Sequence, residues 1–202
     1  MRVLVACEFS GIVRDAFAKR GHDAWSCDLL PTEKPGQHIQ GDVLEILNDG
    51  WDLMIGHPPC TYISFAGTRH WNQPGRVFKR LDALNFFARL WEAPAPKICL
   101  ENPKSCASPV IAKYTQEIQP YYFGDREFKT TWLWLKGLPP LIHNKESDMF
   151  EAQTHTERPE PITVDNTVRK KKRYFVDFTK NPHERSRTFP GIAKAMVEQW
   201  GG

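Results

Sequence analysis

The sequence lacks long apolar runs, and its cysteines are not spaced for metal binding. No stretch approaches the roughly 18 apolar residues that a membrane span needs, so we expect no membrane association. The five cysteines form no C-x-x-C pair and no His-rich set accompanies them, which argues against a metal centre. An odd number of cysteines without a close pair indicates free thiols in a reducing compartment. Because Glu8 interrupts the first apolar run, we expect no signal peptide and predict a cytoplasmic protein.

A large excess of one charge is also missing. The chain carries 27 Lys and Arg against 24 Asp and Glu, a formal net charge of +3. This balance permits a polyanionic partner but does not require one. With 202 residues, of which 41% are hydrophobic, the chain can bury a proper core. We expect one domain, or one domain with a small appendage.

Short apolar runs alternate with helical patterns along the first half of the chain. This alternation predicts a Rossmann-like α/β fold, a doubly wound and mostly parallel sheet with helices on both faces. The expected strands cover residues 2–7, 24–27, 37–43, 51–55 and 97–100, and the expected helices cover residues 12–17 and 77–91.

The pattern changes after Pro120. Residues 121–123 and 131–135 resemble two paired strands around a turn at 124–126. Residues 137–172 show no clear period and are expected to be irregular. We therefore divide the chain into a main region at 1–136, a small irregular appendage at 137–184, and a segment at 185–202 whose helix packs back on the main region.

Polar side chains follow several of the expected strands. In parallel sheets of this kind, ligands bind at the carboxyl ends of the strands. The sequence therefore predicts a functional site at one edge of the sheet. The side chains expected there are Glu8, Asp28, Asp42, Cys60 and Glu101.

Two prolines precede Cys60 in the stretch G-H-P-P-C-T-Y-I-S. Because proline fixes φ, Pro58 and Pro59 would present the Cys60 side chain at a set angle from a loop tip. The alternative is that the prolines only mark a turn and that Cys60 fills a small apolar space. This segment alone favours neither interpretation.

Cys60 and Glu101 together suit addition to an electron-poor ring. Attack by a thiolate at carbon 6 of a pyrimidine moves electrons toward carbon 5 and ring nitrogen 3. A carboxylic acid beside nitrogen 3 can protonate it, and carbon 5 can then take a methyl group from a sulfonium. Such general acid catalysis contributes about 10²–10⁴-fold. It requires a Glu101 that is neutral or that shares a proton.

Four short motifs, in this order, resemble those of the cytosine carbon-5 DNA methyltransferases, and in particular short phage-type members. The resemblance covers residues 2–136 and a C-terminal piece at 189–193, which is similar to the last motif of the family. The four motifs are Phe9-Ser10-Gly11, Gly41-Asp42, Pro59-Cys60 and Glu101-Asn102.

The resemblance implies a catalytic set of Cys60, Glu101 and Asn102 and S-adenosylmethionine as the methyl donor. It places Phe9, Ser10 and Gly11 near the methionine carboxylate at a helix N-terminus. It assigns the ribose hydroxyls to Asp28, the adenine amino group to Asp42, and a further cofactor contact to Pro58. If Asp28 or Asp42 is considered alone, an ordinary solvated carboxylate at a strand end is the simpler explanation. The resemblance gives Glu8 no role.

The implied substrate is DNA, either duplex or already single-stranded, but the sequence departs from the family here. The usual Gln-x-Arg-x-Arg strand and a full target-recognition domain are missing. A basic cluster at 169–173 followed by two aromatic residues could track phosphates and stack a base, although such a run is more often a solvated face. The substrate-binding candidates are Pro59, Ser64, Arg69, Lys129 and Arg173.

Three other functions remain open at the level of sequence. The same ring chemistry could act on a free pyrimidine nucleotide or transfer a group other than methyl. An amino-methyltransferase also uses a Pro-Pro motif, but it needs a polar acceptor where this chain has His57, and it has no use for Glu101-Asn102. A non-catalytic nucleic-acid-binding module would have no need to retain both Cys60 and Glu101.

Overall fold

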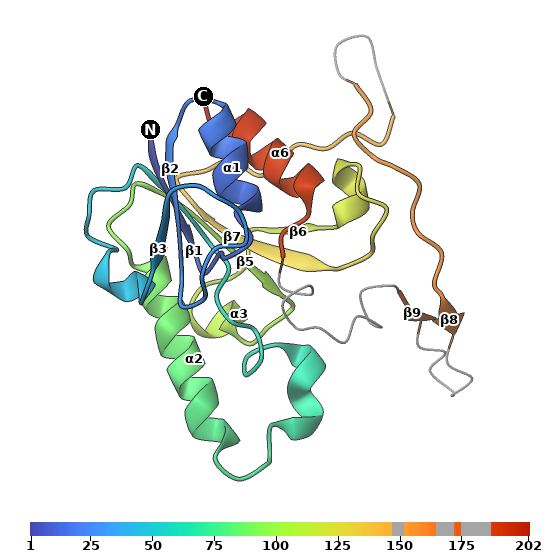
Figure 1. Cartoon of the computed structure of the whole chain (residues 1–202). Helices are drawn as coiled ribbons and strands as arrows, with labels where there is room; N and C mark the ends of the chain where they lie inside the picture. Colours follow the sequence, from blue (N-terminus) through green and yellow to red (C-terminus); the bar gives the residue numbers. More distant parts are fainter. Residues whose placement is uncertain (147–151, 165–171, 175–186) are drawn as a thin grey trace.

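Apolar runs form the central strands of a seven-stranded sheet in this computed structural model, which describes residues 1–146, 152–164, 172–174 and 187–202 (Figure 1). The strand order is β3-β2-β1-β4-β5-β7-β6. The first five strands are parallel, and β7 runs antiparallel to both β5 and β6. The predicted Rossmann-like, mostly parallel sheet is confirmed. The strands are β1 (Arg2–Ala6), β2 (Asp23–Asp28), β3 (His38–Gln40), β4 (Leu53–Gly56), β5 (Lys97–Pro103), β6 (Gln116–Ile118) and β7 (Thr131–Lys136).

Helices cover both faces of this sheet, because the strands are apolar on both sides. Val3 and Val5 of β1 face a core formed with α1 (Ile12–Lys19) and α6 (Pro190–Trp200), which pack together. Leu4 and Ala6 of the same strand face a second core. That second core includes residues of α2 (Arg76–Trp91) and α3 (Ala107–Val110).

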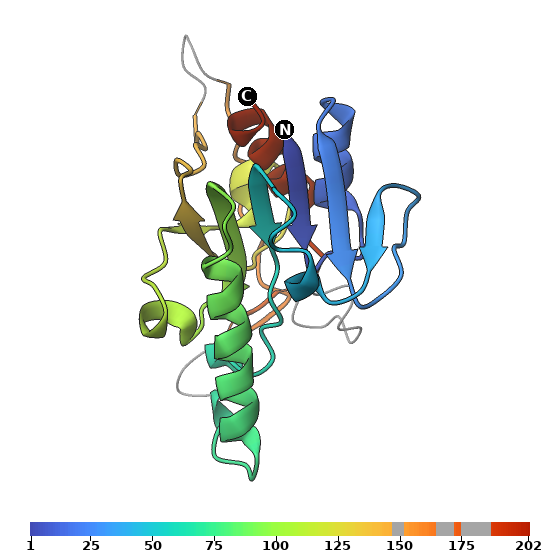
Figure 2. The same ribbon diagram turned by 90° about the vertical axis from the view of Figure 1, so that its left-hand side faces the viewer.

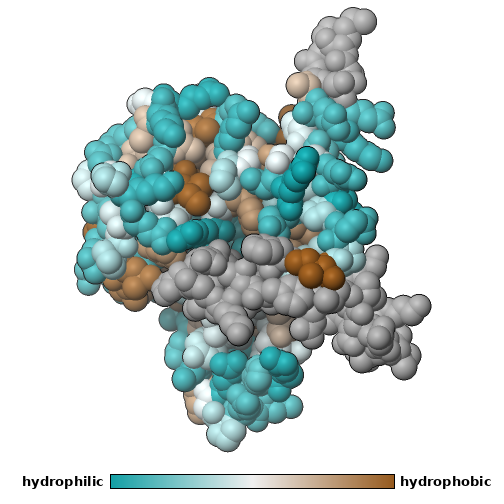
Figure 3. Space-filling view, turned by 45° about the vertical axis from the view of Figure 1, so that its right-hand side comes forward, coloured by the Kyte–Doolittle hydropathy of each residue, from teal (hydrophilic) through white to brown (hydrophobic). Residues whose placement is uncertain are grey.

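The N-terminal half of α2 extends beyond the carboxyl ends of the strands (Figure 2). It forms an arm together with the short helix η2 (Phe65–His70). Hydrophilic side chains predominate on the arm in the space-filling view (Figure 3). Of the helices that the structure describes, none has the length and apolar character needed to cross a membrane.

The prediction of a strand at 121–123 was wrong. These residues belong to the 3₁₀ helix η3 (Pro120–Phe123), and β7 pairs instead with β5 and β6. Pro120 occupies the start of this helix, where its fixed φ is favourable and its missing N–H costs nothing. Gly124, at φ 92°, ends it.

The described part of the appendage, residues 137–146, 152–164 and 172–174, contains little regular structure. Two residues of β8 (Thr163–Val164) pair antiparallel with two of β9 (Lys172–Arg173).

A third short helix, η1 (Val43–Glu45), follows β3. The final helix begins at Pro190, since proline is well suited to the first turn of a helix.

Arg14 is a buried arginine that fixes the loop after β2. It lies on α1 and is only 1% exposed. A side chain at Gly11 or Gly36 would clash with the Arg14 guanidinium, so both glycines allow its close approach. Its partners are Asp15 at 2.8 Å, Ser26 Oγ at 3.3 Å, Thr32 Oγ1 at 3.1 Å and the carbonyl oxygens of Lys34 and Pro35 at 3.1 and 3.2 Å.

We predict that Arg14→Met lowers the free energy of unfolding by about 3 kcal/mol, because it leaves buried acceptors of the loop without a donor. Arg20→Met is the matched control, since the Arg20 side chain is 55% exposed and lies 3.7 Å from Glu198. The control should cost less than about 1 kcal/mol. Urea unfolding measures both values, and equal losses would contradict the role given to Arg14.

Candidate active site at the carboxyl ends of the strands

The register of the parallel strands brings the predicted site residues to one edge. Ala6 of β1 is level with Gly56 of β4, and Gly56 is level with Leu100 of β5. The amide of His57 still donates to the Ala6 carbonyl, at 2.9 Å. The next residues along these strands, His57 and Glu101, are therefore neighbours at the carboxyl end of the sheet.

His57 and Glu101 form a buried ion pair at this edge. Nδ1 of His57 lies 3.0 Å from Oε2 of Glu101, and the two side chains are 9% and 10% exposed. Burial works against the charge on both groups, but the hydrogen bond and the opposite charge outweigh it. The pKa of His57 is raised and the pKa of Glu101 is lowered. The proton shared by the pair therefore resides on the imidazole.

Two further side chains complete the surroundings of this pair. Thr188, from the segment before α6, places Oγ1 at 3.4 Å from Oε2 of Glu101 and at 3.4 Å from the ring nitrogens of His57. Lys129 contributes positive charge that lowers the pKa of both His57 and Glu101. Thr188 thus brings the segment before α6 into contact with this pair.

Asn102 fixes the Pro-Pro-Cys loop rather than facing an open space. Its Nδ2 donates to the carbonyl oxygen of Pro58 at 2.7 Å, and the side chain is only 2% exposed. This hydrogen bond joins the end of β5 to the loop that follows β4. We therefore assign Asn102, which the resemblance placed among the catalytic residues, to positioning of the loop.

The chain after Cys60 is also tied to the segment that follows β5. The Cys60 carbonyl accepts from the amides of Ile63 and Ser64, at 3.2 and 2.9 Å. Ile63 in turn accepts from the amide of Cys106 at 3.0 Å. Cys60 is partly exposed, as are Cys7 and Cys106, whereas Cys27 and Cys99 are buried.

Asp28 and Asp42 lie at the neighbouring strand ends, as predicted. One oxygen of Asp28 accepts from the amide of Leu30 at 2.9 Å. One oxygen of Asp42 accepts from the amide of Leu44 at 2.9 Å and caps η1. These turns hold both carboxylates at the edge, in an orientation that each turn sets.

Glu8 has a clear structural role that the sequence did not reveal. Its carboxylate accepts from the amides of Val13 and Arg14, at 2.7 and 3.2 Å, and from Ser10 Oγ at 3.3 Å. Glu8 is 4% exposed and so caps the N-terminus of α1 from within the core. An anionic ligand would have to compete with this carboxylate for the same two amides.

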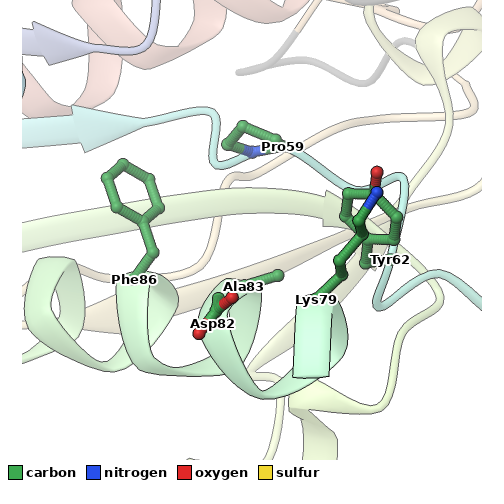
Figure 4. Close-up of a pocket in the computed structure, with 6 residues that line it drawn as sticks. All are labelled: Pro59, Tyr62, Lys79, Asp82, Ala83 and Phe86. Carbon is green, nitrogen blue, oxygen red and sulfur yellow. The ribbon is translucent and has the colours of Figure 1, made fainter. Parts of the chain in front are cut away.

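The other substrate-binding candidates are dispersed. Pro59 lines a groove of about 410 Å³ between the Cys60 loop and α2, with Tyr62, Lys79 and Phe86 among its neighbours (Figure 4). Ser64 is buried, and its Oγ accepts from the amide of Ala66 to cap η2.

Two basic candidates lie further from the strand ends. Arg69 lies on the exposed arm and donates from Nε to His70 Nε2 at 2.8 Å. Arg173 belongs to β9 by its backbone, but its side chain, like residues 169–171 of the basic cluster, lies outside the described residues. Among the side chains that the structure describes, no group of three or more His, Cys, Asp or Glu is arranged to hold a metal ion.

Comparison with known proteins finds similarity among solved structures. No protein-family model matches the chain, and no curated protein matches it. A candidate DNA modification methyltransferase encoded within a prophage, from E. coli, is 16% identical, with a TM-score of 0.42. The match covers 66% of this chain and 45% of the prophage protein, so this chain spans less than half the length of that protein. A likeness this low carries no argument about function.

We predict that the His57–Glu101 pair stabilises the fold within a limited pH window. The raised pKa of His57 gives stability below its ordinary 6.5, which is lost as pH rises through the folded value. The lowered pKa of Glu101 gives stability above its ordinary 4.5, which is lost as pH falls through the folded value. The unfolding free energy of wild type should therefore exceed that of the double variant His57→Gln/Glu101→Gln most between about pH 4.5 and 6.5.

Urea unfolding from pH 3 to 9 gives the two curves. The matched control is Arg20→Gln/Glu198→Gln, a surface pair 3.7 Å apart, whose difference from wild type should stay small throughout. A His57–Glu101 difference that does not vary with pH would contradict the assigned charges.

Proposed function

We propose that this protein is an S-adenosylmethionine-dependent DNA methyltransferase that acts on carbon 5 of cytosine through a covalent bond to Cys60. The observation that carries the proposal is the hydrogen bond from Asn102 to Pro58. Because of it, the Glu-Asn end of β5 and the Pro-Cys loop form one site. Cys60 is partly exposed on that loop, and Glu101 precedes Asn102 directly.

In this mechanism Cys60 and Glu101 act on opposite parts of one pyrimidine ring. The Cys60 thiolate adds to carbon 6, and ring nitrogen 3 receives a proton from the carboxyl group of Glu101. The resulting electron-rich carbon 5 is the atom that takes the methyl group. Loss of the proton on carbon 5 and departure of the thiolate then restore the aromatic ring. The two prolines before Cys60 limit the loss of conformational freedom on forming the bond.

The site fits the nucleoside part of S-adenosylmethionine, which when bound would supply an electrophilic methyl group. Asp28 and Asp42 each use one carboxylate oxygen to accept a backbone N–H. Their remaining acceptor capacity suits the ribose hydroxyls and the adenine amino group. The α1 N-terminus fits the carboxylate of that ligand less well, because Glu8 already accepts from two of its amides.

DNA as the substrate is supported by the arm beside the site. Arg76 and Lys79 lie over the ring of Tyr62, at 4.7 and 5.6 Å from its centre. Arg80 lies over the ring of Trp71 at 4.4 Å. With Arg69, these side chains place positive charge and aromatic rings on a projecting element, a combination that suits a phosphate backbone and unstacked bases.

The His57 ring has a position that disfavours the amino-methyltransferase alternative. That chemistry needs a polar acceptor before the prolines to bind the exocyclic amine of the base. In this structure Nδ1 of His57 is paired with Glu101 inside the protein. The raised pKa of His57 favours the imidazolium, in which both nitrogens carry protons and neither can accept from an amine.

We predict that DNA containing 5-fluorocytosine, incubated with the wild-type protein and S-adenosylmethionine, forms a covalent adduct that survives denaturing electrophoresis. Fluorine cannot leave as a proton does, so the reaction stops at the enzyme-bound stage. Cys60→Ser should abolish the adduct, whereas Cys106→Ser, at another partly exposed cysteine, should preserve it. An adduct with Cys60→Ser, or none with wild type, would contradict the proposal. An adduct that forms with the fluorinated nucleotide but not with the fluorinated DNA would indicate that the substrate is a free nucleotide.

We predict that Asp28→Ala weakens binding of S-adenosylmethionine by roughly 10- to 100-fold, since hydrogen bonds to a charged group contribute about 1.5–3 kcal/mol. Isothermal titration calorimetry measures this affinity without any need for catalysis. Asp23→Ala is the control, because Asp23 lies at the other end of the same strand. If Asp28→Ala bound S-adenosylmethionine with unchanged affinity, Asp28 would not be part of the cofactor site.

A further inference from the structure

His57 is the one charged neighbour of Glu101 within hydrogen-bonding distance among the described residues, and neither the motifs nor the resemblance gives it a role. Its position follows from the parallel register, because His57 extends β4 by one residue and Glu101 lies on the adjacent strand. The 3.0 Å contact joins Nδ1 of His57 to Oε2 of Glu101.

A proton donor is needed at nitrogen 3, but a carboxylate paired with an imidazolium has no proton of its own. Burial and the neighbours of the pair leave the proton on the imidazole in the resting site. Glu101 can therefore protonate a base only after it has taken up a proton from a neighbour. The geometry meets this condition, since Nδ1 of His57 lies 3.0 Å from Oε2 of Glu101.

We propose that His57 stores the proton that Glu101 delivers to the ring, an inference that rests on the proposed cytosine carbon-5 chemistry. As the Cys60 thiolate forms its bond to carbon 6, the N–H bond at Nδ1 of His57 breaks and its proton passes to Oε2 of Glu101. The neutral carboxyl group then gives this same proton to nitrogen 3, as the O–H bond at Oε2 breaks and the N–H bond at nitrogen 3 forms. The thiolate and the imidazolium are both neutralised, and the net charge of the site is unchanged. When the thiolate leaves, the proton returns along the same path.

His57 is thus a positioning residue that acts through Glu101 and does not touch the base. The groups that face it from the surrounding elements fit this role. Glu101 of β5 and Glu8, after β1, raise its pKa, Lys129 before β7 lowers it, and Thr188 before α6 contacts both members of the pair. Because Lys129 lowers the pKa of His57, it favours transfer of the proton from His57 to Glu101.

The rate of a single methyl transfer, measured as a function of pH, tests this inference. In wild type the rate should fall as pH rises through the pKa of His57, which lies above the ordinary 6.5. In His57→Gln the carboxyl group must carry its own proton, so the fall should move to a lower pH. At pH 8 the variant should be about 100-fold slower, within the range of general acid catalysis. His22→Gln, at the opposite end of the sheet, is the control and should match wild type.

A second measurement does not depend on activity or on the folding of a His57 variant. In protein with ¹⁵N-labelled histidine, the His57 ring should titrate above pH 6.5 in wild type and at a lower pH in Glu101→Gln. An identical pH profile in active wild type and His57→Gln would overturn the inference, as would a His57 ring that is neutral at pH 6. In either case the proposed function would stand. Absence of methyl transfer by wild type would overturn both.

Discussion

The hydrogen bond from the Asn102 amide to the Pro58 carbonyl is the contact on which the site depends. It is buried, and it joins the ends of two adjacent parallel strands. Glu101, the neighbour of Asn102, pairs with His57, the neighbour of Pro58. The two strand ends are therefore linked twice within a few residues. Since the prolines already restrict the loop, these two links are sufficient to fix the direction in which Cys60 is presented.

The electrostatics of the site follow from the same arrangement. A buried carboxylate alone would become protonated, because burial disfavours its charge. His57 reverses this tendency, and Lys129 adds to the effect. In the resting site the proton of the pair is therefore on His57 and not on the carboxyl group of Glu101. Removal of one member of a buried pair leaves an uncompensated charge, so we expect both residues to be needed for a stable site.

Much of the fold could be predicted from the sequence, because the strands of a doubly wound sheet are apolar on both faces and end in recognisable polar residues. The edge that holds Asp28, Asp42 and Glu101 follows directly from that pattern. The strand at 121–123 was predicted wrongly, since Pro120 starts a helix there and the polar edge strand β6 shows no apolar alternation. The roles of His57 and Glu8 depend on contacts across the sheet and at a helix end, which local patterns do not show.

We propose that Cys60 and Glu101 act together on carbon 5 of a cytosine ring in DNA. Mass spectrometry of nucleosides from the DNA of cells that express the protein tests this most directly. We expect 5-methyl-2′-deoxycytidine in cells with the wild-type chain and none in cells with Cys60→Ser. A methyl group found on an exocyclic amine instead, or equal amounts of 5-methyl-2′-deoxycytidine with both chains, would contradict it.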